Sequence, residues 1–525
     1  MLKEKSIAIN RKKGKVIGIC VYILFLIVVG INFYTKLINE ETCGPKSKIL
    51  FTALFTLVSV AAAIIIFYLN KKDRIKPEKV FLIIGVTFGI MYMFATPLFK
   101  GHDEQYHWYK SYAVSLGKFK AVQNEEKILG DYLPKMVNDV FEIQGFFTGI
   151  NYKTAASAWK YSIDNNYKSE EVFTYNAPTA IYPPIQMIPQ AIGIIISRAI
   201  CLDIYTQGMF ARLGNLCFFL CLGYFSIKNI PRKKYFLSLF LLSPKIMYIS
   251  STMSGDVFTN SMIIFFITYI LKLKHEKKLL NWKNYLVLFI SIPCVAICKT
   301  IYIPICLLVL MLPRECFNKK SKKVLFVVLA ISIALSTSLL WTKLSNNISL
   351  DTTSDTNASK QLKYVLENPV SYIGVLIRGV CNNFIVWAED IVGGYMEWGS
   401  GLTQPEIVSM IVFIILILSL ANEGDTEKEK LKIWEYILII IMILIVVAGV
   451  LSAMYIQWTP NYAKVGGLDI IGVQGRYFVP IIPLIAMLIP MKFLETKNKL
   501  DIKWLYIIII LCEVFSLLNI FVRNI

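Results

Sequence analysis

The densest group of residues able to do acid–base chemistry in this 525-residue chain lies at positions 102–107. It contains His102, Asp103, Glu104 and His107, and the whole chain has only three histidines. Adjacent carboxylates can act as a general base or hold a divalent cation. If a helix begins at Asp103, Glu104 and His107 lie three residues apart on one of its faces. Alternatively Asp103 caps a helix over 104–116 and Glu104 favours its first turn, and spacing alone leaves both interpretations open.

Three cations are suited to binding an anion. Arg476 lies in segment 472–480, where the chain passes from a polar loop into an apolar run. A guanidinium at a membrane surface suits bidentate phosphate binding, although it can also snorkel to lipid headgroups. Arg212 begins an apolar run, where it needs a partner or an anionic ligand, and Lys299 lies between two apolar runs.

Four further residues are candidates for lining a pocket: Tyr182, Asp256, Gln474 and Tyr477. Two prolines follow Tyr182, so a rigid turn is the alternative there. Asp256 can instead cap the helix that follows it. Because these acids and cations all flank apolar runs, the sequence predicts that they collect at one membrane face.

The elements that must position these residues are membrane spans. Hydrophobic residues make up 56% of the chain, and runs of about 20 apolar residues are long enough to cross a ~30 Å hydrocarbon core. Charged residues divide them into thirteen predicted crossings: 16–34, 49–70, 79–98, 208–228, 235–251, 257–273, 284–297, 300–313, 324–342, 405–421, 434–456, 476–493 and 502–523.

Lysine and arginine set the predicted orientation. The net charge of +20 comes largely from clusters in short gaps between spans, and such loops stay cytoplasmic. The N-terminus is therefore predicted inside and the C-terminus outside, and the charge serves topology, with no nucleic-acid partner expected. Two segments follow from this requirement: 284–313 is a hairpin with its apex near Lys299, and 185–200 is interfacial or half-inserted.

The predicted fold class is an all-α integral membrane protein with two large extracytoplasmic loops, placed in a bacterial cytoplasmic membrane. The first loop carries the candidate acids, and the second contains an amphipathic stretch, 361–398. The predicted divisions are 1–98 (N-terminal helices), 99–184 (first loop), 185–342 (central bundle), 343–404 (second loop) and 405–525 (C-terminal helices).

Several motifs resemble those of one bacterial membrane family. They are the 96–117 block with Asp103, Glu104 and His107, Tyr-Pro-Pro at 182–184, Arg212 with Asn215, Ser243-Pro244 before Gly255-Asp256, Lys299 before Tyr302 and Pro304, and Trp458-Thr459-Pro460 before 474–478. Together they are similar to the family known as domain of unknown function 2142. That family in turn resembles the GT-C superfamily of polytopic glycosyltransferases. One departure is His102, where the family more often has proline.

The resemblance implies a fold of the GT-C kind and an inverting sugar transfer from a polyprenyl-phosphate-linked donor to a cell-surface acceptor such as a polysaccharide or teichoic acid. It implies Asp103 as the base, with Glu104 and His107 orienting the acceptor, and it implies that Arg476, Lys299 and Arg212 hold the donor phosphate. Secondary candidates on the acceptor side are Glu389, Asp390 and Glu397. Members of the superfamily differ in metal use, so a divalent cation such as Mg²⁺ or Mn²⁺ is left open.

Two other classes of protein are compatible with the sequence. A lipid-linked glycan transporter or flippase would need polar residues in mid-span along a continuous path, and the sequence offers few. An assembly or receptor protein without catalysis would leave Asp103 and Arg476 as anchors. Transfer of labelled sugar distinguishes the enzyme from both alternatives.

Overall fold

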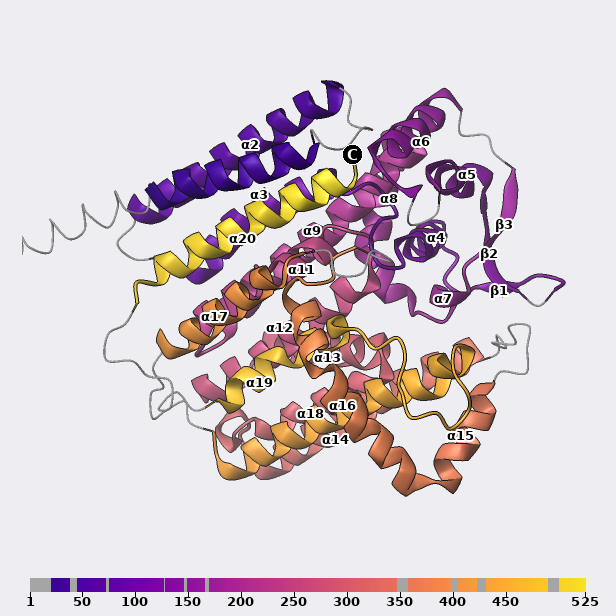
Figure 1. The fold of residues 1–525 in the computed structure, drawn as a ribbon. Helices are drawn as coiled ribbons and strands as arrows, with labels where there is room; N and C mark the ends of the chain where they lie inside the picture. Colours follow the sequence, from indigo (N-terminus) through magenta and orange to yellow (C-terminus); the bar gives the residue numbers. More distant parts are fainter. Residues whose placement is uncertain are drawn as a thin grey trace, which may run out of the picture.

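A computed structural model of the chain describes residues 20–37, 45–71, 75–126, 128–145, 149–165, 170–346, 357–397, 404–422, 431–489 and 500–525. In these ranges nine helices are long and apolar enough to cross a membrane. They are Cys20–Leu37, α2 (Pro45–Lys71), α3 (Pro77–Ala95), α9 (Ile204–Asn229), α12 (Gly255–Glu276), α14 (Lys320–Asn346), α16 (Pro369–Val392), α18 (Ile433–Ala453) and α20 (Ile502–Arg523). Most run side by side as one bundle (Figure 1).

Several predicted spans are shorter than a full crossing. The predicted span 235–251 is two helices, α10 (Lys234–Leu241) and α11 (Pro244–Ser250), because Pro244 begins a new helix. The others are α13 (Trp282–Cys298), η3 (Thr300–Met311), α17 (Glu406–Asn422) and the pair η8 (Gly475–Ile481) and α19 (Ile482–Leu488). Prolines inside α13, η3 and η8 remove helical hydrogen bonds and favour such breaks.

The segment predicted as a hairpin is one in the structure. Helix α13 ends at Cys298, Lys299 is extended, and η3 begins at Thr300. At the open end of the hairpin the Leu280 N–H donates to the Cys316 carbonyl at 3.0 Å. Lys299 therefore lies at the apex, as the sequence predicts.

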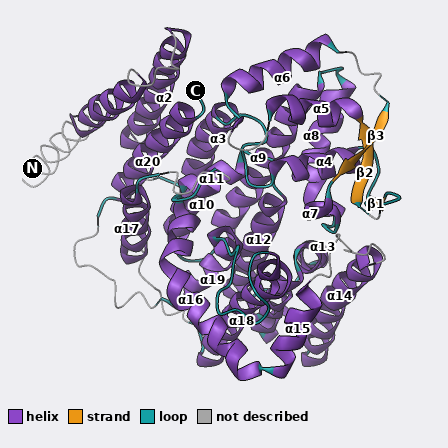
Figure 2. Ribbon diagram, turned by 45° about the vertical axis from the view of Figure 1, so that its right-hand side comes forward, coloured by secondary structure: helices purple, strands orange, loops and turns teal. Residues whose placement is uncertain are grey.

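A polar domain lies at one end of the bundle (Figures 1 and 2). Its elements are α4 (Glu104–Ser115), β1 (Val122–Gln123), β2 (Leu129–Pro134), α5 (Lys135–Gln144), α6 (Tyr152–Asp164), β3 (Glu171–Tyr175), α7 (Ala177–Ala180) and η2 (Pro184–Met187). The strands form an antiparallel sheet in the order β1-β2-β3, with Gly130 opposite Tyr175. The predicted all-α class holds for the bundle, but the sequence did not predict this small sheet within 99–184.

Helix α8 (Ile188–Ala199) joins the polar domain to the bundle. At 1.5 Å per residue it is about 18 Å long, too short to cross ~30 Å of hydrocarbon. It packs closely on α9, because a side-chain carbon on Gly193 would lie 2.1 Å from the Phe210 carbonyl oxygen and one on Gly214 would lie 2.0 Å from that of Pro189. This contact fixes the part of α9 that carries Arg212.

The region predicted as a second loop is largely helical. It contains α15 (Asn357–Glu367) and α16, and α16 alone meets the length and hydropathy of a span. Near its start, Tyr372 stacks on Tyr455, just beyond α18, with ring centroids 5.8 Å apart. Near its end, Asp390 accepts from the Gly475 N–H at 2.7 Å. Both ends therefore meet elements at the site end of the bundle, so α16 lies across the bundle and exposes an apolar face, as in-plane amphipathic helices do.

The bundle has two chemically different ends. Helix α12 runs from Asp256 to Lys274, a distance of about 27 Å at 1.5 Å per residue. The Asp256 end meets the polar domain, and the Lys274 end lies among other basic residues from the short loops. Asn524, the residue before the last, lies at the Asp256 end, where its carbonyl accepts from the Tyr152 N–H at 2.9 Å.

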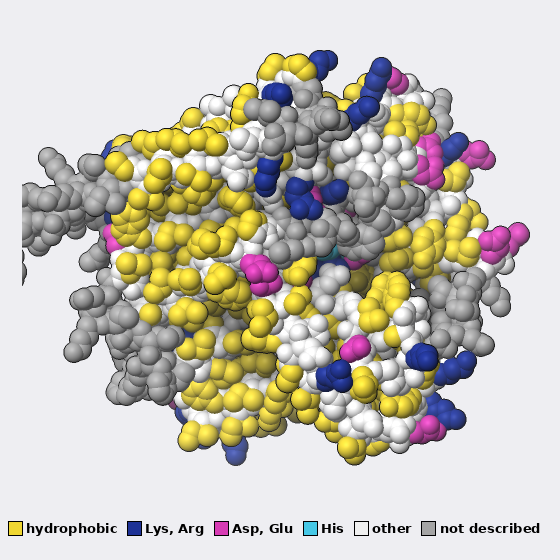
Figure 3. Space-filling view, in the orientation of Figure 1, with side chains coloured by type: hydrophobic (Ala, Val, Ile, Leu, Met, Phe, Trp, Pro, Cys, Tyr) yellow, Lys and Arg dark blue, Asp and Glu magenta, His cyan; other side chains and the backbone are white. Residues whose placement is uncertain are grey.

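The outer surface agrees with a lipid environment. In Figure 3 hydrophobic side chains cover most of the left part of the face, over the long helices, and charged side chains gather toward the right and at the edges. Many exposed large side chains on α2, α14, α16 and α18 are aliphatic or aromatic. A water-soluble protein rarely exposes so much contiguous apolar surface.

Candidate functional site

Asp103 is directed into the site and caps no helix. It precedes α4 with a left-handed backbone (φ 54°), and its side chain makes no capping hydrogen bond. Its carboxylate accepts from Arg476 Nη2 at 2.8 Å, and the Asp103 side chain is 33% exposed. Because the backbone turns at this residue, Asp103 and the adjacent Glu104 point to different partners. The capping alternative for Asp103 was wrong.

Glu104 forms a fully buried ion pair with Arg212. The Glu104 oxygens accept from Arg212 Nε and Nη2, both at 2.7 Å, and both side chains are 0% exposed. The remaining Arg212 donors bind backbone carbonyls of residues 93, 96 and 97. All five guanidinium N–H groups are thus used. Arg212 therefore fastens the end of α3 to α9. It has no N–H group left to bind the phosphate of a sugar donor, which is the role that the family resemblance implies.

The carboxylate of Glu104 is equally occupied. It also accepts from the Gly101 and Met253 N–H groups, at 2.9 and 2.8 Å. These contacts tie the loop before α4 to the segment before α12. We therefore assign Glu104 to holding the site together, which differs from the acceptor-orienting role that the family resemblance implies.

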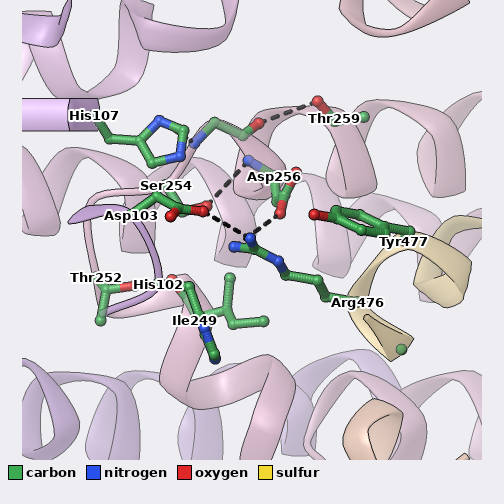
Figure 4. Close-up of polar contacts among 12 residues, drawn as sticks. His102, Asp103, His107, Ile249, Thr252, Ser254, Asp256, Thr259, Arg476 and Tyr477 are labelled. Carbon is green, nitrogen blue, oxygen red and sulfur yellow. Dashed lines mark hydrogen bonds and ion pairs between the residues drawn. The ribbon is translucent and has the colours of Figure 1, made fainter. Parts of the chain in front are cut away.

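Arg476 lies between two carboxylates (Figure 4). Its Nη2 binds Asp103, and its Nη1 lies 3.5 Å from Asp256. The Arg476 side chain is only 4% exposed, so the alternative that it snorkels to lipid headgroups was wrong. Among the parts of the chain that the structure describes, its Nε has no hydrogen-bond partner. This guanidinium therefore keeps a donor that an anion can use.

Close backbone packing holds Arg476 in place. Gly475, directly before it, approaches α16 so closely that a side-chain carbon there would lie 2.3 Å from the Trp387 carbonyl oxygen. The Gly475 N–H also donates to Asp390. A residue larger than glycine would push η8, and with it Arg476, away from Asp103.

Asp256 and Lys299 form a second ion pair beside Arg476. Helix α12 is capped by Ser254, whose side chain accepts from the Asp256 N–H, so the capping alternative for Asp256 was wrong. The Asp256 carboxylate instead accepts from Lys299 Nζ at 2.8 Å. Lys299 Nζ also lies 4.9 Å from the ring centroid of Tyr477 and 5.9 Å from that of Tyr182.

His107 is buried one helical turn along α4 from Asp103. Its Nδ1 lies 3.3 Å from the Gly255 nitrogen, and its ring packs against Tyr182 with centroids 5.8 Å apart. Burial lowers the pKa of His107 to about 4, so the ring is neutral at pH 7. A neutral ring that accepts from the Gly255 N–H carries its proton on Nε2, and His107 thereby positions the start of α12.

Sequence reasoning missed a further ion pair of the site, between Lys245 and Asp390. Lys245 of α11 is 2.7 Å from Asp390, and its Nζ lies 3.0 Å from His102 Nε2. Burial, together with the neighbouring cations Lys245 and Arg476, lowers the pKa of His102 well below its usual value. A signal was available, because a lysine inside an apolar stretch is costly without a partner.

Of the remaining candidate residues, some lie at the site and others serve elsewhere in the fold. Gln474 precedes Arg476, and within the described ranges its Oε1 is buried without a hydrogen-bond partner. Glu397 binds Arg523 at 3.3 Å and Asn524 at 2.6 Å, so it anchors the C-terminus. The backbone carbonyl of Glu389 accepts from the Gly393 N–H, which is the bond that ends α16.

The acids of the site do not fit a divalent cation in this arrangement. In the described ranges, no group of three or more His, Cys, Asp or Glu side chains is placed to hold a metal ion. The two acids beside Arg476, which are Asp103 and Asp256, face the same guanidinium, and that group already supplies positive charge between them.

Fold and site together define a polytopic helical membrane protein in which four ion pairs gather at one end of the bundle: Glu104–Arg212, Asp103–Arg476, Asp256–Lys299 and Lys245–Asp390. The chain belongs to the family described as "Predicted membrane protein (DUF2142)", which matches residues 86–485, more than half of its length. This confirms the family resemblance inferred from the motifs. Comparison with curated proteins and with solved structures gave no match.

Proposed function

We propose that the protein is an inverting glycosyltransferase that moves a sugar from a polyprenyl-phosphate-linked donor to an extracytoplasmic acceptor. The observation that carries this proposal is the contact between Asp103 and Arg476. A partly exposed carboxylate lies 2.8 Å from a buried guanidinium that keeps an unused N–H. A base and an anion-binding group are thus adjacent, as sugar transfer from a phosphate leaving group requires.

In the proposed reaction an acceptor hydroxyl attacks the anomeric carbon of the donor sugar. The bond between that carbon and the phosphate oxygen breaks, and its electron pair leaves with the polyprenyl phosphate. Asp103 takes the hydroxyl proton. Arg476 and Lys299 stabilise the negative charge that grows on the leaving phosphate, while Gln474, Tyr182 and Tyr477 line the space for the sugar.

Donor binding would also release the base. Without substrate, Asp103 and Asp256 both neutralise Arg476. A phosphate that binds Arg476 competes with Asp103 for the same N–H groups, whereas Asp256 keeps Lys299 as its partner. Asp103, the more exposed of the two acids, is then free to accept a proton from the acceptor.

The proposal places the site end outside the cytoplasmic membrane, the N-terminus inside and both large loops outside. Basic residues gather at the opposite end of α12, and basic loops stay cytoplasmic. In a background with the native cysteines replaced, we expect a membrane-impermeant maleimide to label Ser157→Cys on α6 in intact cells. Lys277→Cys at the basic end should be labelled only after permeabilisation, and the reverse pattern would exclude an extracytoplasmic site.

The transfer reaction can be tested through Arg476. Membranes containing the protein and their native acceptors are supplied with radiolabelled undecaprenyl-phosphate sugars, and label leaving the lipid fraction is measured. Arg476→Lys keeps the charge but loses the planar fork of donors. We expect kcat/KM to fall roughly 10- to 100-fold, the cost of one or two hydrogen bonds to a charged group.

Arg523→Lys is the matched control, because Arg523 lies at the same end of the bundle and binds Glu397 rather than Asp103. Its transfer rate should stay near that of the unaltered protein. Equal rates for both variants would show that Arg476 does not hold the leaving group. Movement of labelled lipid across the membrane without sugar transfer would instead favour a flippase.

A further inference from the structure

The basic end of the bundle encloses a pocket that the proposed transfer reaction does not use. Its volume is about 320 Å³, within the range of small-molecule sites. Its lining includes six cations that come from five separate places in the sequence: Arg232, Lys274 with Lys277, Arg314, Lys323 and Lys432. Among the lining residues that the structure describes, the only acids are Glu315 and Glu435, so the cations outnumber the acids there.

Part of this charge is neutralised within the pocket. Lys274 Nζ lies 2.7 Å from the Glu435 carboxylate. The same carboxylate accepts from the backbone N–H of Lys432, a contact that does not involve the Lys432 ammonium. Lys323 Nζ donates to the Leu310 carbonyl at 3.2 Å. Lys277 and Arg314 stand exposed at the rim. The surplus of positive charge therefore lies where a ligand can reach it.

Apart from His275, the remaining lining is apolar. Leu271, Leu312, Leu431, Trp434 and Met487 contribute to the same pocket. A cationic rim over an apolar floor, at the membrane end of several helices, suits an anionic group attached to an apolar body. Loop cations that only determine topology need no shared cavity.

We propose that this pocket binds a phosphate group at the basic end of the bundle. The group belongs either to the headgroup of an anionic phospholipid or to a soluble phosphate compound. Since the pocket lies about 27 Å along α12 from Asp256, this site is separate from the one that holds the transferring donor. Guanidinium and ammonium groups converging from several loops are the donors that phosphate prefers.

The test uses the full-length protein in a zwitterionic detergent and follows its thermal unfolding midpoint. One arm titrates short-chain phosphatidylglycerol, a second titrates inorganic phosphate, and short-chain phosphatidylcholine is the blank. We expect a saturable rise in the midpoint with an anionic ligand. The arm that saturates at the lower concentration identifies the source of the phosphate group.

The variant Lys277→Gln/Arg314→Gln removes two rim cations whose side chains are exposed, so folding should not depend on them. Each cation near an anionic surface contributes roughly fivefold in affinity, so we expect a roughly 30-fold weaker response. The matched control is Lys319→Gln/Lys320→Gln, which removes the same charge from exposed positions that do not line the pocket.

An unchanged response in the control together with a weakened one in the rim variant supports the site. Equal weakening in both variants would show diffuse attraction and overturn it, as would the absence of saturable binding by either anionic ligand. The single variant Lys277→Gln, with an expected loss of roughly fivefold, repeats the test if the double variant does not fold. None of these outcomes depends on sugar transfer.

Discussion

Asp103→Asn should abolish most sugar transfer and leave the protein folded. Asparagine has nearly the same shape as aspartate but cannot take a proton at neutral pH. Removal of a general base costs ~10²–10⁴-fold in rate, so we expect kcat to fall by that factor with undecaprenyl-phosphate sugars. The measurement is initial transfer rate per amount of membrane-inserted protein.

The structure explains why folding should survive this change. Asp103 is 33% exposed, and Arg476 keeps Asp256 as a second counter-charge. Asp164→Asn is the matched control, since Asp164 ends α6 in the same polar domain and lies away from Arg476. A folded Asp103→Asn protein that transfers sugar at the normal rate would leave the proposed mechanism without a base.

Local sequence patterns were sufficient to predict the long helices of the bundle. Long apolar runs bounded by charge predict helices such as α9 and α12 within a few residues, because burying a backbone in lipid requires a helix. The Lys299 apex follows from a simple constraint as well, since two basic loops on one side cannot be joined by a single crossing. The site's location at one end of the bundle follows from where acids and cations interrupt apolar runs.

Partners between distant residues could not be predicted in this way. Arg212 and Arg476 are both arginines at the edge of apolar runs. Arg212 has all its donors used, whereas the Nε of Arg476 has no hydrogen-bond partner among the described residues. That difference depends on where the loop after α3 folds back, which no local pattern encodes. The small sheet was missed for a similar reason: β1 has only two residues, and its pairing partner lies across a turn.

Glu104→Gln, one residue from Asp103, should have the opposite consequence: loss of the folded protein rather than of chemistry alone. Glutamine keeps the shape of glutamate but leaves the Arg212 guanidinium without its counter-charge in a site that is 0% exposed. Removing one partner of a buried ion pair costs about 3–5 kcal/mol, a large part of a typical margin of 5–15 kcal/mol. We expect a sharply lower thermal unfolding midpoint and less monodisperse protein in detergent.

A double-mutant cycle can separate the interaction between Glu104 and Arg212 from the contribution of each residue alone. Arg212→Gln alone leaves Glu104 charged and buried, and should destabilise the protein by a similar amount. In Glu104→Gln/Arg212→Gln neither charge remains, so the loss should be smaller than the sum of the two single losses. Recovery should be incomplete, because the carbonyls of residues 93, 96 and 97 lose donors that Arg212 supplies.

Comparing Glu104→Gln with Asp103→Asn decides which of the two adjacent acids is the base. A Glu104→Gln protein with an unchanged midpoint and a transfer rate as low as that of Asp103→Asn would show that Glu104 is the base. The left-handed backbone at Asp103 argues for the other result. That turn sends one carboxylate to a guanidinium with an unused donor and the other to a guanidinium with none, so one acid can exchange its partner for substrate and the other cannot.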